Sequence, residues 1–219
     1  MQKTPLRRWT ERMSSQITAI EQQKKAPGRF SVYVDGEFAF GISDLDLCQL
    51  GLFVGQELEE ERIDEIFAAI DETKCRDYGA KLVAKRMYTK QEIVRKLEQK
   101  GFCRTAIQNT IDILEEYGYL NDEVYAELYL KEYGKKYGIH KLRYDLKNKG
   151  VEDEVLGRCL EKFDNQEELL ELIRQKTRGK KPDRETAAKL IRQLTGKGFS
   201  YDAVKSGLIT LWEEADEIE

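Results

Sequence analysis

The sequence predicts a mainly α-helical protein, in which three tandem three-helix repeats form an elongated, curved scaffold after a small N-terminal antiparallel sheet. Three stretches align without gaps on a shared Lys-Gly pair, at 100–102, 149–151 and 197–199, which we call the KG turns. Their glycines lie 49 and 48 residues apart, and apolar residues recur at matched positions on both sides. A fixed period in this range is typical of stacked units that bury their apolar faces against one another.

An alternating pattern near the N-terminus predicts the sheet. Aromatic and β-branched residues alternate over 30–34 and 37–42, on either side of Asp35-Gly36. This dipeptide favours a type I′ hairpin turn, which needs positive φ at both central residues. Ile17 and Ile20 indicate a weaker third strand, so we expect two or three strands. Because a lone hairpin is marginally stable, the sheet should pack on a neighbouring helix.

Helical periodicity covers most of the remaining chain. Ser43 is expected to cap a short helix, and a long helix follows from about 57 to 87, with 77–79 as a candidate interruption. Thr89 and Glu92 fit a capping box at the start of the next helix, and Gly101 fits its C′ position. Further helices are expected at 105–117, 122–136, 139–149, 153–163, 166–178, 184–197 and 201–213.

These elements divide the chain into five segments. They are an extension expected to be disordered (1–14), a β-hairpin region (15–56), a linker helix with the first repeat (57–121), the second repeat (122–165), and the third repeat with an acidic C-terminal end (166–219).

Composition excludes several classes of protein. The net charge of −4 argues against a DNA-binding protein that uses its whole surface, although residues 76–150 carry 16 basic and 11 acidic side chains. His140 is the only histidine, and no glycine-rich phosphate-binding motif occurs, so we expect neither an enzyme nor a cofactor. No apolar run reaches membrane-spanning length.

The four cysteines are scattered and form no CxxC pair. Cys48, Cys75, Cys103 and Cys159 therefore read as reduced packing residues of a cytosolic protein. None has a metal-ligand spacing to His140, so no metal site is expected.

Basic residues gather at the turns of the predicted repeats. Cations near a helix C-terminus are favoured by the helix dipole by about 0.3–1 kcal/mol each, which could alone explain Lys100, Lys149 and Lys197. Solvated helix faces could explain the wider charge contrast. Lysine pairs before a helix oppose the dipole, so we interpret the turns as a surface for an extended acidic partner, either a phosphate backbone or a protein groove. The candidate partner-binding residues are Arg86, Arg95, Lys96, Lys100, Lys135, Lys136, Arg143, Lys147, Lys149, Lys180, Lys181, Arg192 and Lys197.

Tyrosine is abundant, with 11 copies. Seven lie in the second repeat and its approach, at Tyr117, Tyr119, Tyr125, Tyr129, Tyr133, Tyr137 and Tyr144. Packing between helices accounts for such a group, and stacking on bases or on a protein surface is the alternative.

Several motifs of the helical region are specific in spacing. They are Glu92–Leu97 before Lys100-Gly101-Phe102, Gly118–Asp122 before Tyr125-Ala126, and Gly138–Arg143 before Leu146-Lys147 and Lys149-Gly150-Val151. With these motifs, the hairpin Phe30–Ile42 and the segment Leu52–Leu58, roughly residues 15–213 resemble the RecX family, the regulators of the RecA recombinase.

The resemblance implies a cytoplasmic, non-enzymatic protein of three tandem three-helix repeats. It implies binding to RecA, typically within the groove of its nucleoprotein filament, so that ATP hydrolysis, strand exchange and co-protease activity fall. Some members of the family also contact DNA. We expect a monomer that binds bare DNA weakly and in a salt-sensitive way.

Two alternative functions remain at this stage. The chain could be a direct DNA-binding protein built from helix-turn-helix-like repeats, or a helical scaffold for another protein. Family chains usually begin close to the Ile17 strand, so we hypothesise that Met13 is the biological start and that 1–12 is an extension. The intact mass of the protein from its native host tests this hypothesis.

Overall fold

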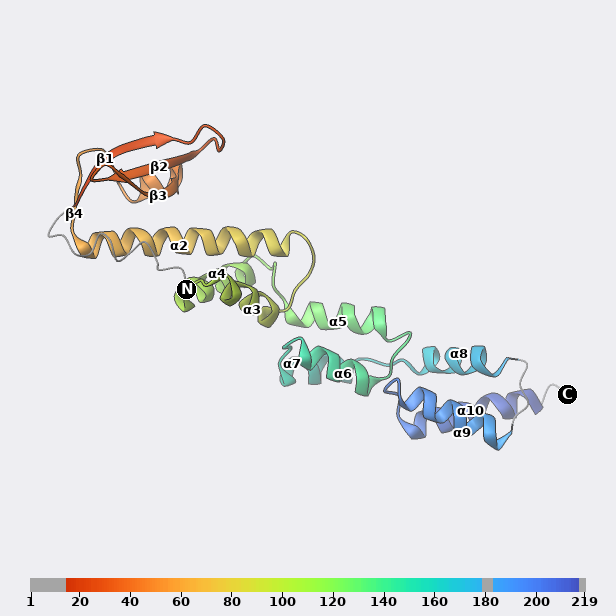
Figure 1. The fold of residues 1–219 in the computed structure, drawn as a ribbon. Helices are drawn as coiled ribbons and strands as arrows, with labels where there is room; N and C mark the ends of the chain where they lie inside the picture. Colours follow the sequence, from red (N-terminus) through yellow and green to blue (C-terminus); the bar gives the residue numbers. More distant parts are fainter. Residues whose placement is uncertain (1–14, 179–182, 217–219) are drawn as a thin grey trace. The chain divides into compact units, whose positions relative to one another are not determined.

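The computed structural model describes residues 15–178 and 183–216, and the side chains as far as 212. The predicted extension at 1–14 and the candidate residues Lys180 and Lys181 lie outside the described residues. The described residues form four strands and ten helices, which confirms the mainly α-helical class (Figure 1). The chain divides into two compact units, one of residues 1–78 with 100–110 and one of 79–99 with 111–219.

The first unit contains a four-stranded antiparallel sheet of order β3-β2-β1-β4. Its strands are β1 (Ser15–Gln22), β2 (Arg29–Val34), β3 (Glu37–Ser43) and β4 (Glu57–Leu58). Asp35 and Gly36 have φ of 51° and 81°, as a type I′ turn requires. The expectation of two or three strands was wrong by one strand. Sequence patterns could not reveal β4, because two residues that pair with Ser15 and Gln16 show no periodicity.

Two helices accompany the sheet. Ser43 caps α1 (Asp44–Gln49) by accepting a hydrogen bond from the Asp46 amide. The long helix α2 (Glu60–Val83) begins three residues later than predicted, because β4 takes its expected first turn. It also continues through Gly79, so the candidate interruption was wrong.

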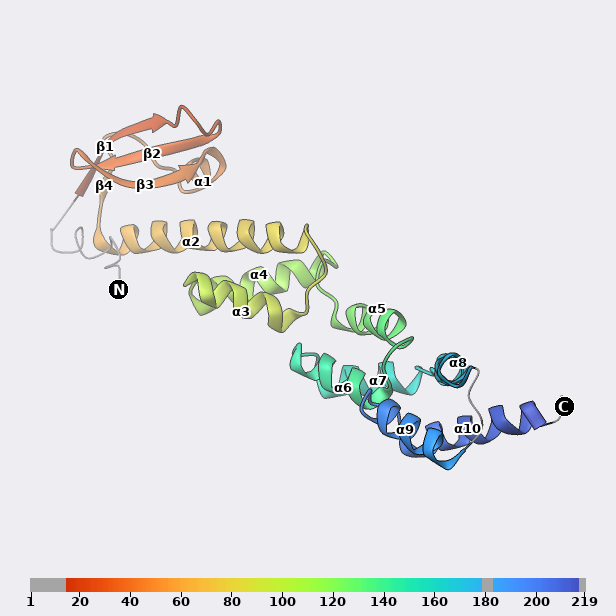
Figure 2. The same ribbon diagram turned by 45° about the vertical axis from the view of Figure 1, so that its right-hand side comes forward.

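The core of the first unit lies between the sheet and α2, which runs along one face of the sheet (Figures 1 and 2). Alternate residues of β1, β2 and β3 point into this core, as do α2 residues at helical spacing. The buried set includes Ile17, Val32, Val34, Phe40, Ile42, Leu58, Ile63, Ile66 and Ile70. The helix thus supplies the packing that the hairpin lacks alone.

The repeats follow α2. Their helices are α3 (Lys90–Lys100), α4 (Arg104–Glu116), α5 (Asp122–Tyr133), α6 (Ile139–Asn148), α7 (Asp153–Glu161), α8 (Gln166–Thr177), α9 (Arg184–Thr195) and α10 (Tyr201–Asp216). The second and third repeats each have a core of their own, around Leu142 and Leu146 and around Leu190 and Leu194. These leucines occupy matched positions in the alignment of the KG turns, so the repeat prediction is confirmed.

The predicted capping box is present, and other helices of the repeats are also capped. The Thr89 hydroxyl accepts from the Glu92 amide at 3.2 Å, and the Glu92 carboxylate accepts from the Thr89 amide at 3.3 Å, which is a capping box. Asn121 caps α5, and Ser200 accepts from the Ala203 amide at the start of α10. At the other ends, the three KG glycines have φ of 86°, 88° and 89°, as expected for C′ residues.

Two KG turns also hold neighbouring repeats together. The Lys149 carbonyl accepts a hydrogen bond from the Thr89 hydroxyl at 2.6 Å, and the Lys197 carbonyl accepts one from the Gly138 amide at 3.0 Å. Thr89 and Gly138 are the N-cap residues of α3 and α6 and stand at matched positions, 12 residues before the KG glycines of their own repeats. Each of these turns therefore binds the N-terminus of the second helix in the preceding repeat.

Candidate partner-binding site

Three tyrosines line one side of α5. Tyr125, Tyr129 and Tyr133 follow one another at four-residue spacing, which places them on the same face of a helix. The rings of Tyr125 and Tyr129 are stacked, with centroids 6.3 Å apart and planes at 17°. The rings of Tyr129 and Tyr133 lie 4.4 Å apart at 31°. All three pack partly against the core of the second repeat, so the helix-packing interpretation holds for this inner group.

A basic side chain completes the tyrosine row. The Lys149 ammonium lies 5.6 Å from the ring centroid of Tyr125 and 5.8 Å from that of Tyr129, within the range of a cation–π contact. It also forms an ion pair with Glu92 at 3.3 Å. The contact of the second KG turn with α3 thus brings a lysine from α6 over tyrosines of α5.

The carboxylate of Glu92 also pairs with a second basic residue, Arg86. Arg86 lies 3.5 Å from the Glu92 carboxylate, and its guanidinium carbon is 3.6 Å from the ring centroid of Tyr88. The Glu92 side chain is only 19% exposed, and it forms ion pairs with both cations. One carboxylate therefore positions Arg86 and Lys149 on either side of it.

These residues enclose a groove of about 440 Å³. Its lining consists of Arg86, Met87, Tyr125, Leu128, Tyr129, Glu132, Tyr133 and Lys149, which we call the tyrosine groove. Met87 and Leu128 remain 45% and 47% exposed, so the groove offers apolar surface to solvent. Aromatic and apolar faces beside cations suit a flat ring together with an acidic group, as in a nucleotide of single-stranded DNA.

Burial and neighbouring charges fix the protonation of this site. Burial, together with a smaller effect of the Asp145 charge, raises the pKa of Tyr129 to about 12, so its phenol is neutral near pH 7. Burial lowers the pKa of Lys149, but hydrogen bonding to Tyr125 and the charge of Glu92 outweigh burial and give a net increase. Lys149 is therefore a cation at neutral pH.

The other candidate residues are distributed over both units. Lys96 lies 5.6 Å from the Tyr88 ring centroid, and Lys100 lies 5.3 Å from that of Tyr78. Lys147 pairs with Asp153 at 2.8 Å. Lys135 and Lys136 line a separate groove of about 830 Å³ with residues of α8. Three arginines have exposed side chains and form no ion pair with a described residue: Arg95, Arg143 and Arg192. The side chain of Lys197 is half-buried.

Of the predicted residues that the structure describes, Arg86 and Lys149 line the tyrosine groove. Glu92, Met87 and Leu128 were not predicted as parts of this site. The four-residue spacing of the tyrosines could have indicated their shared face. The pairing of Glu92 with Lys149 joins residues 57 positions apart, and no local pattern indicates it.

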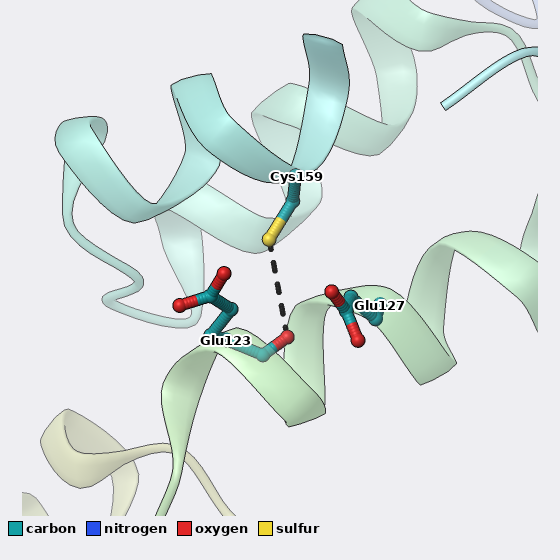
Figure 3. A group of neighbouring side chains, drawn as sticks. All are labelled: Glu123, Glu127 and Cys159. Carbon is teal, nitrogen blue, oxygen red and sulfur yellow. Dashed lines mark hydrogen bonds between the residues drawn. The ribbon is translucent and has the colours of Figure 1, made fainter. Parts of the chain in front are cut away.

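A cysteine and two glutamates form a second cluster, in which Glu123, Glu127 and Cys159 lie between α5 and α7 (Figure 3). Their ligand atoms lie within 4.8 Å of one another. Glu123, however, already pairs with Arg158 at 3.4 Å and with Lys162 at 4.0 Å. Burial raises the pKa of the Cys159 thiol, and the charge of Glu123 raises it further, which disfavours the thiolate that a metal would need. We therefore interpret the cluster as ion pairs around a buried thiol.

The cysteines should differ sharply in reactivity. Cys48 and Cys103 are exposed, whereas Cys75 and Cys159 are buried with raised thiol pKa values, chiefly because of burial. We expect a disulfide reagent at pH 8 to modify Cys48 and Cys103 rapidly, and the buried pair only after unfolding. Timed labelling followed by peptide mass spectrometry checks this order. Equal labelling of all four thiols in the folded protein would contradict it.

Among the described helices, none is both long and apolar enough to cross a bilayer.

Three parts of the chain match domains of a known protein family. Residues 15–59 match the RecX N-terminal domain, 75–114 match the first three-helix domain of RecX, and 164–208 match the third. The regulatory protein RecX of Clostridium perfringens (strain SM101 / Type A) is 34% identical over 197 residues, which cover 87% of this chain and 93% of the relative.

The chain belongs to the RecX family. The RecX of Caldanaerobacter subterraneus subsp. tengcongensis is 30% identical over 193 residues, or 88% of this chain and 98% of the relative. A crystal structure of a regulatory protein RecX superposes with a TM-score of 0.68 at 27% identity, and covers 87% of this chain and 97% of its own. RecX family members are regulatory proteins and not enzymes.

Proposed function

We propose that this chain binds the RecA nucleoprotein filament in the bacterial cytoplasm and lowers its ATPase, strand-exchange and co-protease activities. In this role it acts as a monomer in homologous recombination, DNA repair and the SOS response. The observation that carries the proposal is the similarity to RecX proteins over nearly their whole length. The exposed cations of the repeats supply the charge that an acidic filament surface would attract.

The proposal includes weak contact with DNA through the tyrosine groove. Its stacked rings suit bases, and Arg86 and Lys149 suit phosphates. With a net charge of −4, the chain should bind bare DNA weakly at physiological salt. A protein that binds DNA directly and without RecA is the alternative that this groove supports.

The RecA ATPase is the first test. The single-strand-dependent ATPase of the host's RecA is measured while this protein is titrated in at substoichiometric amounts. We expect inhibition well below one molecule per RecA, because a filament-bound regulator affects many subunits. Unchanged ATPase in the presence of folded protein would contradict the proposal. Equal affinity for bare DNA and for the RecA filament at physiological salt would favour the alternative.

Two exposed arginines test the basic surface. Arg95 and Arg143 lie on the second helices of successive repeats, and neither forms an ion pair with a described residue. Reversal of both charges to glutamate should weaken filament binding about three- to tenfold, because long-range attraction to an acidic partner falls. Lys149 is not part of this test, because its pairing with Glu92 also holds two repeats together.

The control for this pair is the variant with Lys189→Glu and Lys205→Glu. These lysines are exposed, lie on α9 and α10, and give the same change in net charge outside the candidate residues. Binding is measured by anisotropy of the labelled protein, and helix content by circular dichroism. Equal loss in both variants would show a nonspecific charge effect.

A further inference from the structure

The second and third repeats contact the repeat before them in the same way. In the second repeat, the Lys149 carbonyl accepts from the N-cap residue of α3, and Gly150 lies against Gln91. In the third repeat, the Lys197 and Gly198 carbonyls accept from the amides of Gly138 and His140 at the start of α6. The second and third KG turns thus present backbone carbonyl oxygens and a bare glycine to the first turn of a helix, whose free amides and dipole are positive.

The first KG turn has the same geometry without such a neighbour. Gly101 has a φ of 86°, close to the 88° and 89° of its two counterparts. Gly150 and Gly198 are partly covered, whereas Gly101 is exposed, and no described atom lies within 4 Å of the position that a Cβ would take. Among the described residues no repeat lies before the first one, so within this part of the chain the face that the other two turns use is open here.

A groove of about 730 Å³ in the first unit lies beside this open turn and has Gly101 and Cys103 in its lining. The other walls come from β3 and α2 and include the aromatic rings of Phe38 and Phe67. Phe38 is 57% exposed, which is high for a phenylalanine. The charged lining residues are Asp64, Asp71 and Lys74, so the groove is apolar with an excess of negative charge.

We propose that this open KG turn and groove bind the N-terminus of a helix in the partner protein. The first turn of that helix would lie on Gly101, as the first turns of α3 and α6 lie on Gly150 and Gly198. An apolar residue of the helix would contact Phe38, and the positive end of the helix dipole would face Asp64 and Asp71. The inference rests on the proposed function, because it assigns the helix to a RecA subunit of the filament.

A second copy of this chain fits the open turn less well. Among the second helices of the three described repeats, α9 is the one whose N-terminus no other described repeat covers. Aligned on the KG glycines, Thr186 corresponds to Thr89 and Gly138, yet α9 begins at Arg184 with Asp183 as its N-cap. This additional turn covers the position where a KG turn would bind, and the Asp183 side chain already accepts from the Thr186 amide. The occupant is therefore a helix of another protein.

The test is the full-length Gly101→Asn variant. Asparagine tolerates positive φ better than other non-glycine residues, so the turn should be retained while its open face is blocked. The control is Gly55→Asn, because Gly55 has a φ of 91°, lies in the same unit and also has no described atom within 4 Å of the position that a Cβ would take. Binding to filaments of the host's RecA on single-stranded DNA is measured by anisotropy, and self-association by sedimentation.

We expect Gly101→Asn to weaken filament binding about tenfold or more, and Gly55→Asn to leave it unchanged. Equal binding by wild type and both variants would overturn this inference and leave the proposed function intact. If the wild type failed to bind the filament, the proposed function and this inference would both fail. Self-association that only Gly101→Asn abolishes would make a second copy the occupant and overturn the assignment to a partner helix.

Discussion

The Gly198→Ala variant is expected to lose about 2–5 kcal/mol of stability in the contact between the second and third repeats. The added methyl group would lie 2.5 Å from the backbone nitrogen of Lys141 and 3.0 Å from its α carbon. Backbone atoms cannot rotate away as a side chain can, so the two repeats must separate. The backbone strain of alanine at a φ of 89° adds about 1–2 kcal/mol to about 1–3 kcal/mol of overpacking.

The matched control is Gly101→Ala. Its φ of 86° imposes the same backbone strain, but no atom of the described residues outside its chain neighbours lies within 4 Å of the new methyl group. This variant should therefore lose only the strain, about 1–2 kcal/mol. The difference in the free energy of unfolding between the two variants therefore measures the effect of the steric contact between repeats.

Local and global measurements check this prediction. Hydrogen exchange at the His140 amide, which donates to the Gly198 carbonyl, should accelerate in Gly198→Ala and not in Gly101→Ala. Urea unfolding followed by circular dichroism gives the accompanying loss of stability. Equal destabilisation by the two substitutions would show that the repeats are not held by this close approach.

The same glycines show what the sequence could and could not predict. A Lys-Gly pair after a periodic helix was enough to predict a C′ residue at Gly101, because helix termination depends on local conformation. Gly150 and Gly198, at the matched positions, also have positive φ. The further role of Gly150 and Gly198 depends on Gln91 and Lys141, which lie in other repeats. A local pattern contains no information on such a neighbour, so the difference from Gly101 became visible only in the structure.

Short and long-range features were missed for related reasons. β4 consists of two residues and is defined only by its pairing with β1, so the helical pattern after it was extended too far toward the N-terminus. The hairpin and the capping box were predicted because each depends on residues a few positions apart. Periodicity thus gives elements and repeats, whereas contacts between repeats depend on tertiary packing.

The candidate residues show the same limit. Turn positions and charge led to Arg86 and Lys149 as candidates, yet Glu92, whose carboxylate lies between them, was considered only as part of a capping box. The tyrosines were left with two interpretations. The structure supports packing for Tyr125, Tyr129 and Tyr133, while Tyr117, Tyr119 and Tyr144 are 72%, 65% and 63% exposed.

Replacement of Tyr125 by leucine should strongly reduce binding of single-stranded DNA by this chain. Stacking of a base on an aromatic ring contributes about 1–3 kcal/mol, so the affinity should fall about 5- to 150-fold. Tyr125 lines the tyrosine groove beside Lys149, and leucine would preserve an apolar contact with the core while removing the flat ring. Binding is measured by anisotropy of a labelled oligothymidylate at low salt, where electrostatic attraction makes the complex detectable.

Two further variants separate stacking from other effects. Tyr125→Phe keeps the ring and loses only the hydroxyl, so it should retain most of the affinity if stacking dominates. Tyr117→Leu removes a ring that is 72% exposed and outside the groove, so it should bind like the wild type. A fall in affinity for Tyr117→Leu equal to that for Tyr125→Leu would locate DNA binding elsewhere. If Tyr125→Leu is the one variant of the three that binds weakly, and its helix content is unchanged, bases stack on the tyrosines of the groove. Arg86 and Lys149, which line the same groove, are then placed to contact the adjoining phosphates.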